Sequence, residues 1–120
     1  MLKATCHCGS VHLSIPRKPR SITNCNCSIC RRYGTLWAYF QLSEVKVEAE
    51  PGVLQSYQWG DRMLDFMRCG RCGCIVQWRP VAPTDKSRTG INARMFEPEL
   101  LGDVKIRRLD GAKSWKVLKD

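Results

Sequence analysis

The sequence predicts an all-β domain whose short sheets are fastened by bound metal ions. Two observations concern chain patterning: short stretches with strand periodicity alternate with Gly, Pro and Asp turns, and no long stretch has the 3.6-residue period of a helix. The third is the cysteine content, eight in 120 residues, in closely spaced groups. The length suits one domain, which we place at residues 1–120.

The first half of the chain carries three predicted strands and one helical turn. Alternating apolar residues predict a strand over 11–15, which Pro16 ends. A cysteine-rich segment over 24–34 is expected to form one short helical turn that ends near Gly34. Residues 35–42 are rich in aromatic and apolar side chains and predict a buried strand, and residues 45–49 predict another.

The second half begins with a predicted hairpin of residues 53–59 and 63–67 around Gly60 and Asp61. Strands are expected over 74–78, 91–95 and 104–109, with a loop over 80–90 and a helical turn over 97–101. The tail from Ala112 is expected to form a short helix that turns Trp115 and Leu118 inward.

The cysteines occur as C-x-C at 6–8, C-x-C-x-x-C at 25–30 and C-x-x-C-x-C at 69–74. An even number of cysteines in a short chain can form disulfides, but these spacings are typical of metal chelation. No apolar run follows the basic N-terminus, so we see no export signal and expect the cytosol, where thiols stay reduced. The pattern therefore favours metal over disulfides.

Two of the groups together supply a complete tetrahedral zinc site. A C-x-x-C knuckle aims both sulfurs one way, and residues i and i+2 of a strand share a face. Cys69 and Cys72 therefore form one pair, Cys6 and Cys8 the other, and the four make a closed, structural Zn²⁺ site.

The remaining group, Cys25, Cys27 and Cys30, has only three sulfurs. Three protein ligands and an open position are typical of catalytic zinc. The alternative is that Cys74 or a histidine closes this site and makes it inert. We interpret His7 and His12 as surface or satisfied histidines and the aromatic residues 37–40 as core.

The three motifs in order, "CHCGSV" at 6–11, "CNCSICR" at 25–31 and "CGRCGC" at 69–74, carry a family resemblance. The chain resembles the glutathione-dependent formaldehyde-activating enzyme family, which includes the centromere protein V domain, over residues 2–110. Supporting stretches are "GTLWAYF", "NARMFEP" and "RRLDGAKSW". Three positions depart from the family pattern: Asn26 replaces a histidine, Cys74 a Thr or Ser, and Arg68 an aromatic residue.

The resemblance implies a tent-like fold of antiparallel sheets, a structural zinc on Cys6, Cys8, Cys69 and Cys72, and a catalytic zinc on Cys25, Cys27 and Cys30. It also implies a carbon–sulfur lyase activity that joins formaldehyde to glutathione as S-hydroxymethylglutathione. The substrates would be a glutathione-like thiol and formaldehyde or another small aldehyde. Arg31 is our candidate cation for the developing alkoxide or for the carboxylates of an anionic thiol, ahead of Arg32.

Two other readings stay open: a non-catalytic, zinc-stabilised binding module with a basic surface, and a thiol or metal sensor. The net charge is +9, with basic groups at 17–20, 31–32 and 105–108. We interpret these as a solvated surface and not a nucleic-acid site, because no basic run is interleaved with aromatic residues that could stack on bases. No stretch approaches the length of a membrane span.

Overall fold

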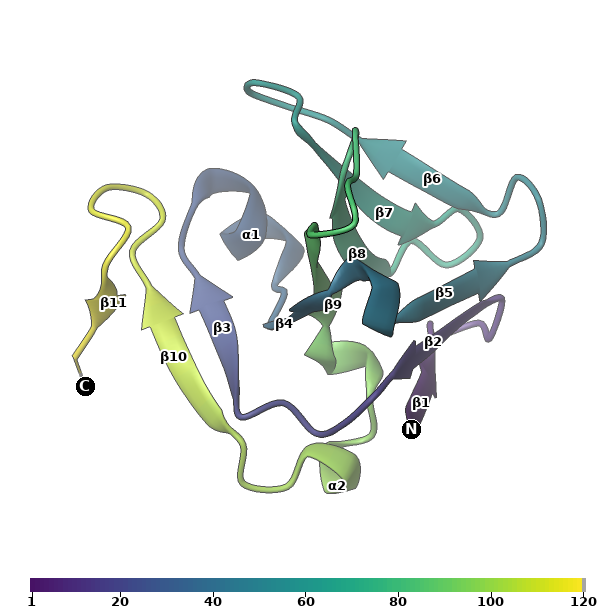
Figure 1. Cartoon of the computed structure of the whole chain (residues 1–120), viewed down its shortest axis with the longest axis horizontal. Helices are drawn as coiled ribbons and strands as arrows, with labels where there is room; N and C mark the ends of the chain where they lie inside the picture. The colour runs from purple at the N-terminus through teal and green to yellow at the C-terminus, as the bar shows by residue number, and fades with distance from the viewer. Residues whose placement is uncertain (120) are drawn as a thin grey trace.

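The computed structural model describes residues 1–119 and contains two β-sheets. The last residue of the predicted domain, residue 120, lies outside the described residues. The small sheet is antiparallel and has the order β1-β2-β5, with β2 in the middle. Its strands are β1 (Leu2–Thr5), β2 (Val11–Ile15) and β5 (Lys46–Ala49). It lies beside the large sheet and near the N-terminus (Figure 1).

The large sheet has the strand order β11-β10-β3-β4-β9-β8-β7-β6. Its strands are β3 (Ser21–Cys25), β4 (Trp37–Gln41), β6 (Leu54–Tyr57), β7 (Leu64–Cys69), β8 (Ile75–Pro80), β9 (Arg88–Asn92), β10 (Lys105–Leu109) and β11 (Val117–Leu118). The helices are α1 (Ser28–Tyr33), η1 (Leu42–Glu44), η2 (Ala93–Met95) and α2 (Pro98–Leu101). Among residues 1–119, no helix is long and apolar enough to cross a membrane.

The predicted all-β class is confirmed, since the chain is mostly β-strand with short helices only, but the large sheet is mixed and not purely antiparallel. β3 and β10 pair in parallel, whereas the other paired strands are antiparallel. Parallel neighbours need a long crossover connection, and here most of the chain separates the two strands. A pairing between such distant segments leaves no local signal in the sequence.

Several expected elements differ from the structure. Strands β1 and β3 were not expected, and β9 starts before the predicted strand at 91–95 because residues 93–95 form η2. The predicted C-terminal helix is wrong. Residues 117–118 pair with β10, and Trp115 and Leu118 are exposed, because the turn before β11 is held to the cysteine-bearing segment.

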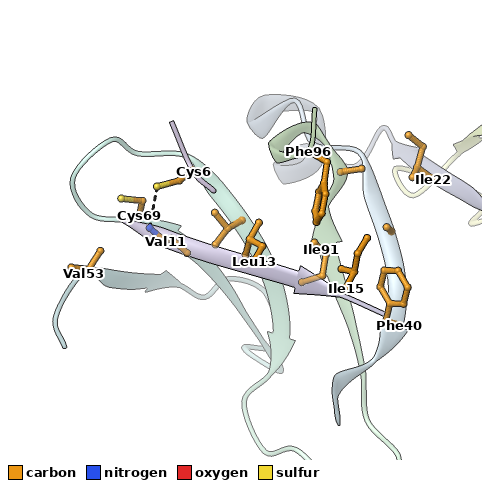
Figure 2. Packing of buried hydrophobic residues seen from close by; sticks show 13 residues of the cluster. Cys6, Val11, Leu13, Ile15, Ile22, Phe40, Val53, Cys69, Ile91 and Phe96 are labelled. Atoms are coloured by element: carbon orange, nitrogen blue, oxygen red, sulfur yellow. Dashed lines mark hydrogen bonds between the residues drawn. The ribbon is translucent and has the colours of Figure 1, made fainter. Parts of the chain in front are cut away.

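The main core lies between the two sheets, and a second buried cluster lies on the other face of the large sheet. Successive side chains of a strand point alternately into one and the other. In β4, Ala38 and Phe40 point into the main core, whereas Trp37 and Tyr39 belong to the second cluster, as strand periodicity requires. Ile15 of β2 lies beside Ile91 and Phe40 (Figure 2). The main core comprises Cys6, Val11, Leu13, Ile15, Ile22, Ala38, Phe40, Val53, Cys69, Val76, Ile91, Ala93 and Phe96. The second comprises Cys25, Ile29, Cys30, Trp37, Phe66 and Ile75.

Gly90 of β9 lies against the indole ring of Trp78, its cross-strand partner in β8. A Cβ atom added at Gly90 would overlap Trp78 Nε1, so the ring would have to move. We expect Gly90→Ala to lower the free energy of unfolding by about 1–3 kcal/mol, the usual cost of overpacking. The check is urea denaturation in both the wild-type and a Trp78→Leu background. The loss should shrink in the second background, and equal losses in both would contradict the contact.

Candidate functional site

Two turns bring together the thiols of Cys6, Cys8, Cys69 and Cys72, which we name the four-cysteine cluster. Their Sγ atoms all lie within 4.8 Å of one another, and Cys8 Sγ is 3.7 Å from both Cys6 Sγ and Cys69 Sγ. Disulfide sulfurs lie about 2.05 Å apart, and all eight cysteines are free thiols. Tetrahedral zinc with bonds of about 2.3 Å separates its sulfurs by about 3.8 Å. The donor set therefore fits zinc in both chemistry and spacing.

The turns of the four-cysteine cluster resemble each other. Backbone N–H groups of Arg71 and Cys72 donate to Cys69 Sγ at 3.4 and 3.5 Å, and the N–H of Val11 donates to Cys6 Sγ at 3.3 Å (Figure 2). A glycine with φ of +82° follows the second cysteine in each turn, Gly9 and Gly73. The expectation that Cys6 and Cys8 lie on one strand is wrong, because both follow the end of β1.

Burial raises the pKa of these thiols, whereas hydrogen bonds from backbone N–H groups lower it. Burial raises the pKa of Cys6 to about 11. Burial also opposes ionisation of Cys72, but backbone hydrogen bonds from Cys74 and Cys8 and the neighbouring thiols lower its pKa to about 6. Thiols that bind a metal ion lose their protons, so a bound cation would balance the negative charge of the thiolates in this cluster.

The second group, Cys25, Cys27 and Cys30, is brought together at the start of α1 and is named the three-cysteine cluster. Cys25 ends β3, Cys27 is the N-cap of α1, and its Sγ accepts a hydrogen bond from Cys30 N at 3.4 Å. The indole Nε1 of Trp37 donates to Cys30 Sγ at 3.4 Å. Burial raises the pKa of both Cys25 and Cys30. These contacts set the directions of two of the three sulfurs.

Neither Cys74 nor a histidine joins the three-cysteine cluster within residues 1–119. Cys74 is half-buried and packs against the main core, outside both clusters. His7 and His12 are exposed and lie in neither cluster. The three thiols therefore form an incomplete set of tetrahedral ligands. The role of both clusters as metal ligands stays a prediction.

A cavity of about 370 Å³ borders all three thiols of this cluster. Its aromatic lining consists of Trp37, Tyr39, Trp59, Phe66, Trp78 and Trp115. Asp61 is the only charged side chain among the lining residues, all of which belong to the described chain. Phe40 and Trp37 are buried in the two core clusters as expected, and Tyr39 packs against the second cluster, while Trp37 and Tyr39 also line the cavity. Sequence reasoning missed Trp59, Trp78 and Trp115, for which no local pattern signals a shared site.

Asn26, between two cysteines of the cluster, holds the turn at residues 109–116, which we name the C-terminal turn. Its Nδ2 donates to Asp110 Oδ1 at 3.0 Å, and its Oδ1 accepts from Ala112 N at 3.0 Å. Its backbone N–H donates to the carbonyl of Leu109 at 3.1 Å. A histidine is the residue that the resemblance leads one to expect here. The asparagine instead anchors the turn that carries Trp115.

Gly111 is the buried residue of this turn and touches the cluster directly. A Cβ atom added there would lie 2.5 Å from Cys25 Sγ and 3.3 Å from Cys27 Cβ. We expect Gly111→Ala to weaken metal binding at the three-cysteine cluster by about 10–100-fold, the usual effect of disturbing the support of a ligand. Competition with a chromophoric chelator measures this, with Ala112→Ser as the control. Equal weakening at the four-cysteine cluster would contradict a local effect.

The structure separates the two arginines of α1. Arg31 is exposed and is not among the lining residues of the cavity over the thiols, so its role stays a prediction. Arg32 and Arg68 line a neighbouring cavity of about 550 Å³, which shares Ile29 and Trp59 with the first. The positive charge beside the cluster therefore comes from two elements, Arg32 of α1 and Arg68 of β7, and not only from the segment after Cys30.

Comparison with known proteins supports the reading of the cysteines. The model of the glutathione-dependent formaldehyde-activating enzyme family matches residues 1–105, which include both clusters and exclude the whole of the C-terminal turn. A crystal structure of a Rhodobacter sphaeroides protein, a structural genomics target, is similar with a TM-score of 0.70 and 29% identity, covering 88% of this chain and 99% of that one. None of the curated proteins compared with the chain matches it.

Proposed function

Because this chain belongs to the glutathione-dependent formaldehyde-activating enzyme family, we propose that it is a zinc-dependent carbon–sulfur lyase that adds a glutathione-like thiol to a small aldehyde. The observation that carries the proposal is the incomplete set of three thiols at the border of a cavity. A purely structural site has no use for such a cavity, whereas a reaction needs both the vacancy and the space.

The two clusters would have different roles. The four-cysteine cluster supplies a full tetrahedral set and would hold a structural zinc that joins the β1–β2 and β7–β8 turns. Zinc on the three-cysteine cluster would supply an open position at which the pKa of an incoming thiol falls. The hydrogen bonds from Trp37 and from the backbone of Cys30 orient two of the sulfurs that would hold this zinc.

In the reaction, the thiol sulfur bonds to the carbonyl carbon, and the π electron pair moves to the oxygen, which takes the proton that the thiol gives up. The buried aromatic side chains of the lining, Trp37 and Phe66, exclude water from their side of the reacting atoms. Arg32 and Arg68 provide guanidinium groups for the carboxylates of a glutathione-like thiol in the adjoining cavity. The earlier candidate, Arg31, would serve instead if the thiol extends along the exposed side of α1.

The proposal is tested by NMR exchange spectroscopy of formaldehyde and glutathione with the zinc-loaded protein. Exchange faster than the uncatalysed rate, lost on chelation and restored by zinc, is expected. A rate equal to the uncatalysed one would refute the enzyme and leave the binding module or the sensor. An Arg68→Gln variant should raise the KM for glutathione by about tenfold, as expected for a lost charge-assisted contact, and leave that for the aldehyde unchanged.

A further inference from the structure

All four tryptophans of the chain line the cavity over the three-cysteine cluster. Trp37 is buried, whereas Trp59 and Trp115 are 43% and 67% exposed. Residues from α1, β4, β7, β8 and the C-terminal turn contribute to the lining. The concentration of aromatic surface at one point of a small domain, beside three thiols, identifies a binding cavity and not a gap in the core.

The size of this cavity exceeds what formaldehyde needs. A water molecule occupies about 30 Å³ in the liquid, and formaldehyde is only slightly larger. A cavity of about 370 Å³ is in the range that accommodates a ring-bearing molecule. A one-carbon aldehyde would leave most of the aromatic surface in contact with water.

The polarity of the lining favours an apolar occupant. Its one carboxylate, Asp61, already accepts a hydrogen bond from Met63 N at 3.0 Å. The indole N–H of Trp37 is engaged with Cys30 Sγ. An aromatic ring can stack or meet edge-to-face with the remaining rings of the lining.

Trp115 is placed at the cavity by contacts that this chain builds for it. Its backbone has a φ of +59°, a conformation that costs free energy outside glycine, and its N–H donates to Asp110 O at 2.7 Å. Asp110 also accepts from Ser114 Oγ at 2.9 Å and from Asn26 Nδ2. Trp115 lies beyond residue 105, where the family match ends. The Trp115 side chain is exposed, yet hydrogen bonds through Asp110 fix the backbone that carries it.

We propose, resting on the proposed function, that the aldehyde used by this protein carries an apolar, ring-sized body of the benzaldehyde class. The ring occupies the space between Trp59 and Trp115, and the carbonyl faces the three thiols. Trp115 is the specificity-determining residue, and Asn26 is a positioning residue that holds its turn.

Binding is tested without any reaction by titrating the zinc-loaded protein with benzyl alcohol, which cannot form the adduct. The four tryptophan indole N–H signals in a proton–nitrogen NMR spectrum report on the cavity, after assignment by Trp→Phe substitutions. We expect the Trp59 and Trp115 signals to shift. Trp115→Ala should weaken binding by about tenfold or more, as expected for removal of a large aromatic contact.

The matched control is Met63→Ala, because Met63 is 64% exposed and lies outside the cavity lining. It should leave the affinity for benzyl alcohol unchanged. Asn26→Ala should weaken binding in the wild-type background and have little further effect once Trp115 is alanine. Unshifted indole signals, or equal losses from Met63→Ala and Trp115→Ala, would overturn the inference.

Kinetics separate this inference from the proposed function. With glutathione as the thiol, Trp115→Ala should lower kcat/KM for benzaldehyde about tenfold more than it lowers kcat/KM for formaldehyde. Exchange of formaldehyde without benzyl alcohol binding would refute the ring-sized substrate while the enzyme stands. Benzyl alcohol binding without catalysis of either aldehyde would refute the enzyme, and the cavity would then be a binding site for apolar rings.

Discussion

Cys69→Ser is expected to abolish cooperative folding of this protein. Cys69 is fully buried, ends β7, and belongs to the four-cysteine cluster that joins two turns distant in sequence. Structural zinc contributes about 10–16 kcal/mol in zinc-finger peptides, as much as the entire stability of a typical domain at about 5–15 kcal/mol. Thermal unfolding followed by circular dichroism should show no transition, and excess chelator should produce the same state in the wild type.

The control for this loss is Cys74→Ser, since Cys74 lies close in sequence but outside both clusters. That variant should keep a cooperative transition and the full complement of bound zinc. A Cys69→Ser protein that melts like the wild type would show that the cluster does not stabilise the sheets. It would also remove the basis for assigning a structural zinc.

Cys27→Ser is expected to abolish activity and to preserve the fold. Serine is a favourable N-cap, so α1 keeps its first hydrogen bond when Cys27 is replaced. The three-cysteine cluster loses a thiol and should release its zinc, so zinc per chain measured by mass spectrometry should fall from two to one. The exchange rate of formaldehyde and glutathione should fall by about 100-fold or more, the upper range for damage to a metal site.

Ser28→Ala, at the neighbouring position of α1, is the matched control and should retain both zinc ions and activity. The melting temperature of Cys27→Ser should stay close to that of the wild type. If Cys27→Ser unfolds the chain, the three-cysteine cluster is structural. If it folds and remains active, the reaction takes place elsewhere on the molecule.

The grouping of the cysteines could be predicted because it depends on residue type and local spacing. Thiols separated by one or two residues can bind one metal ion whatever the surrounding fold. A pair of cysteines supplies only two of the four ligands of zinc, so a second pair elsewhere in the chain is expected to complete the site. Strands with clean alternation, such as β2 and β5, were equally readable. The edge strands β1 and β11 were not, because their pairing is decided by neighbours and not by their own short, mostly exposed segments.

The sequence by itself therefore determined the mostly-β class, the two sulfur clusters and the family, since each depends on periodicity or on ligand spacing. Only the tertiary structure decided that Trp59, Trp78 and Trp115 share one cavity and that Asn26 holds the turn bearing Trp115. Those residues lie far apart along the chain. Sheet order and the parallel β3–β10 pairing bring them together, and side chains that meet in this way leave no periodic signal in any one segment.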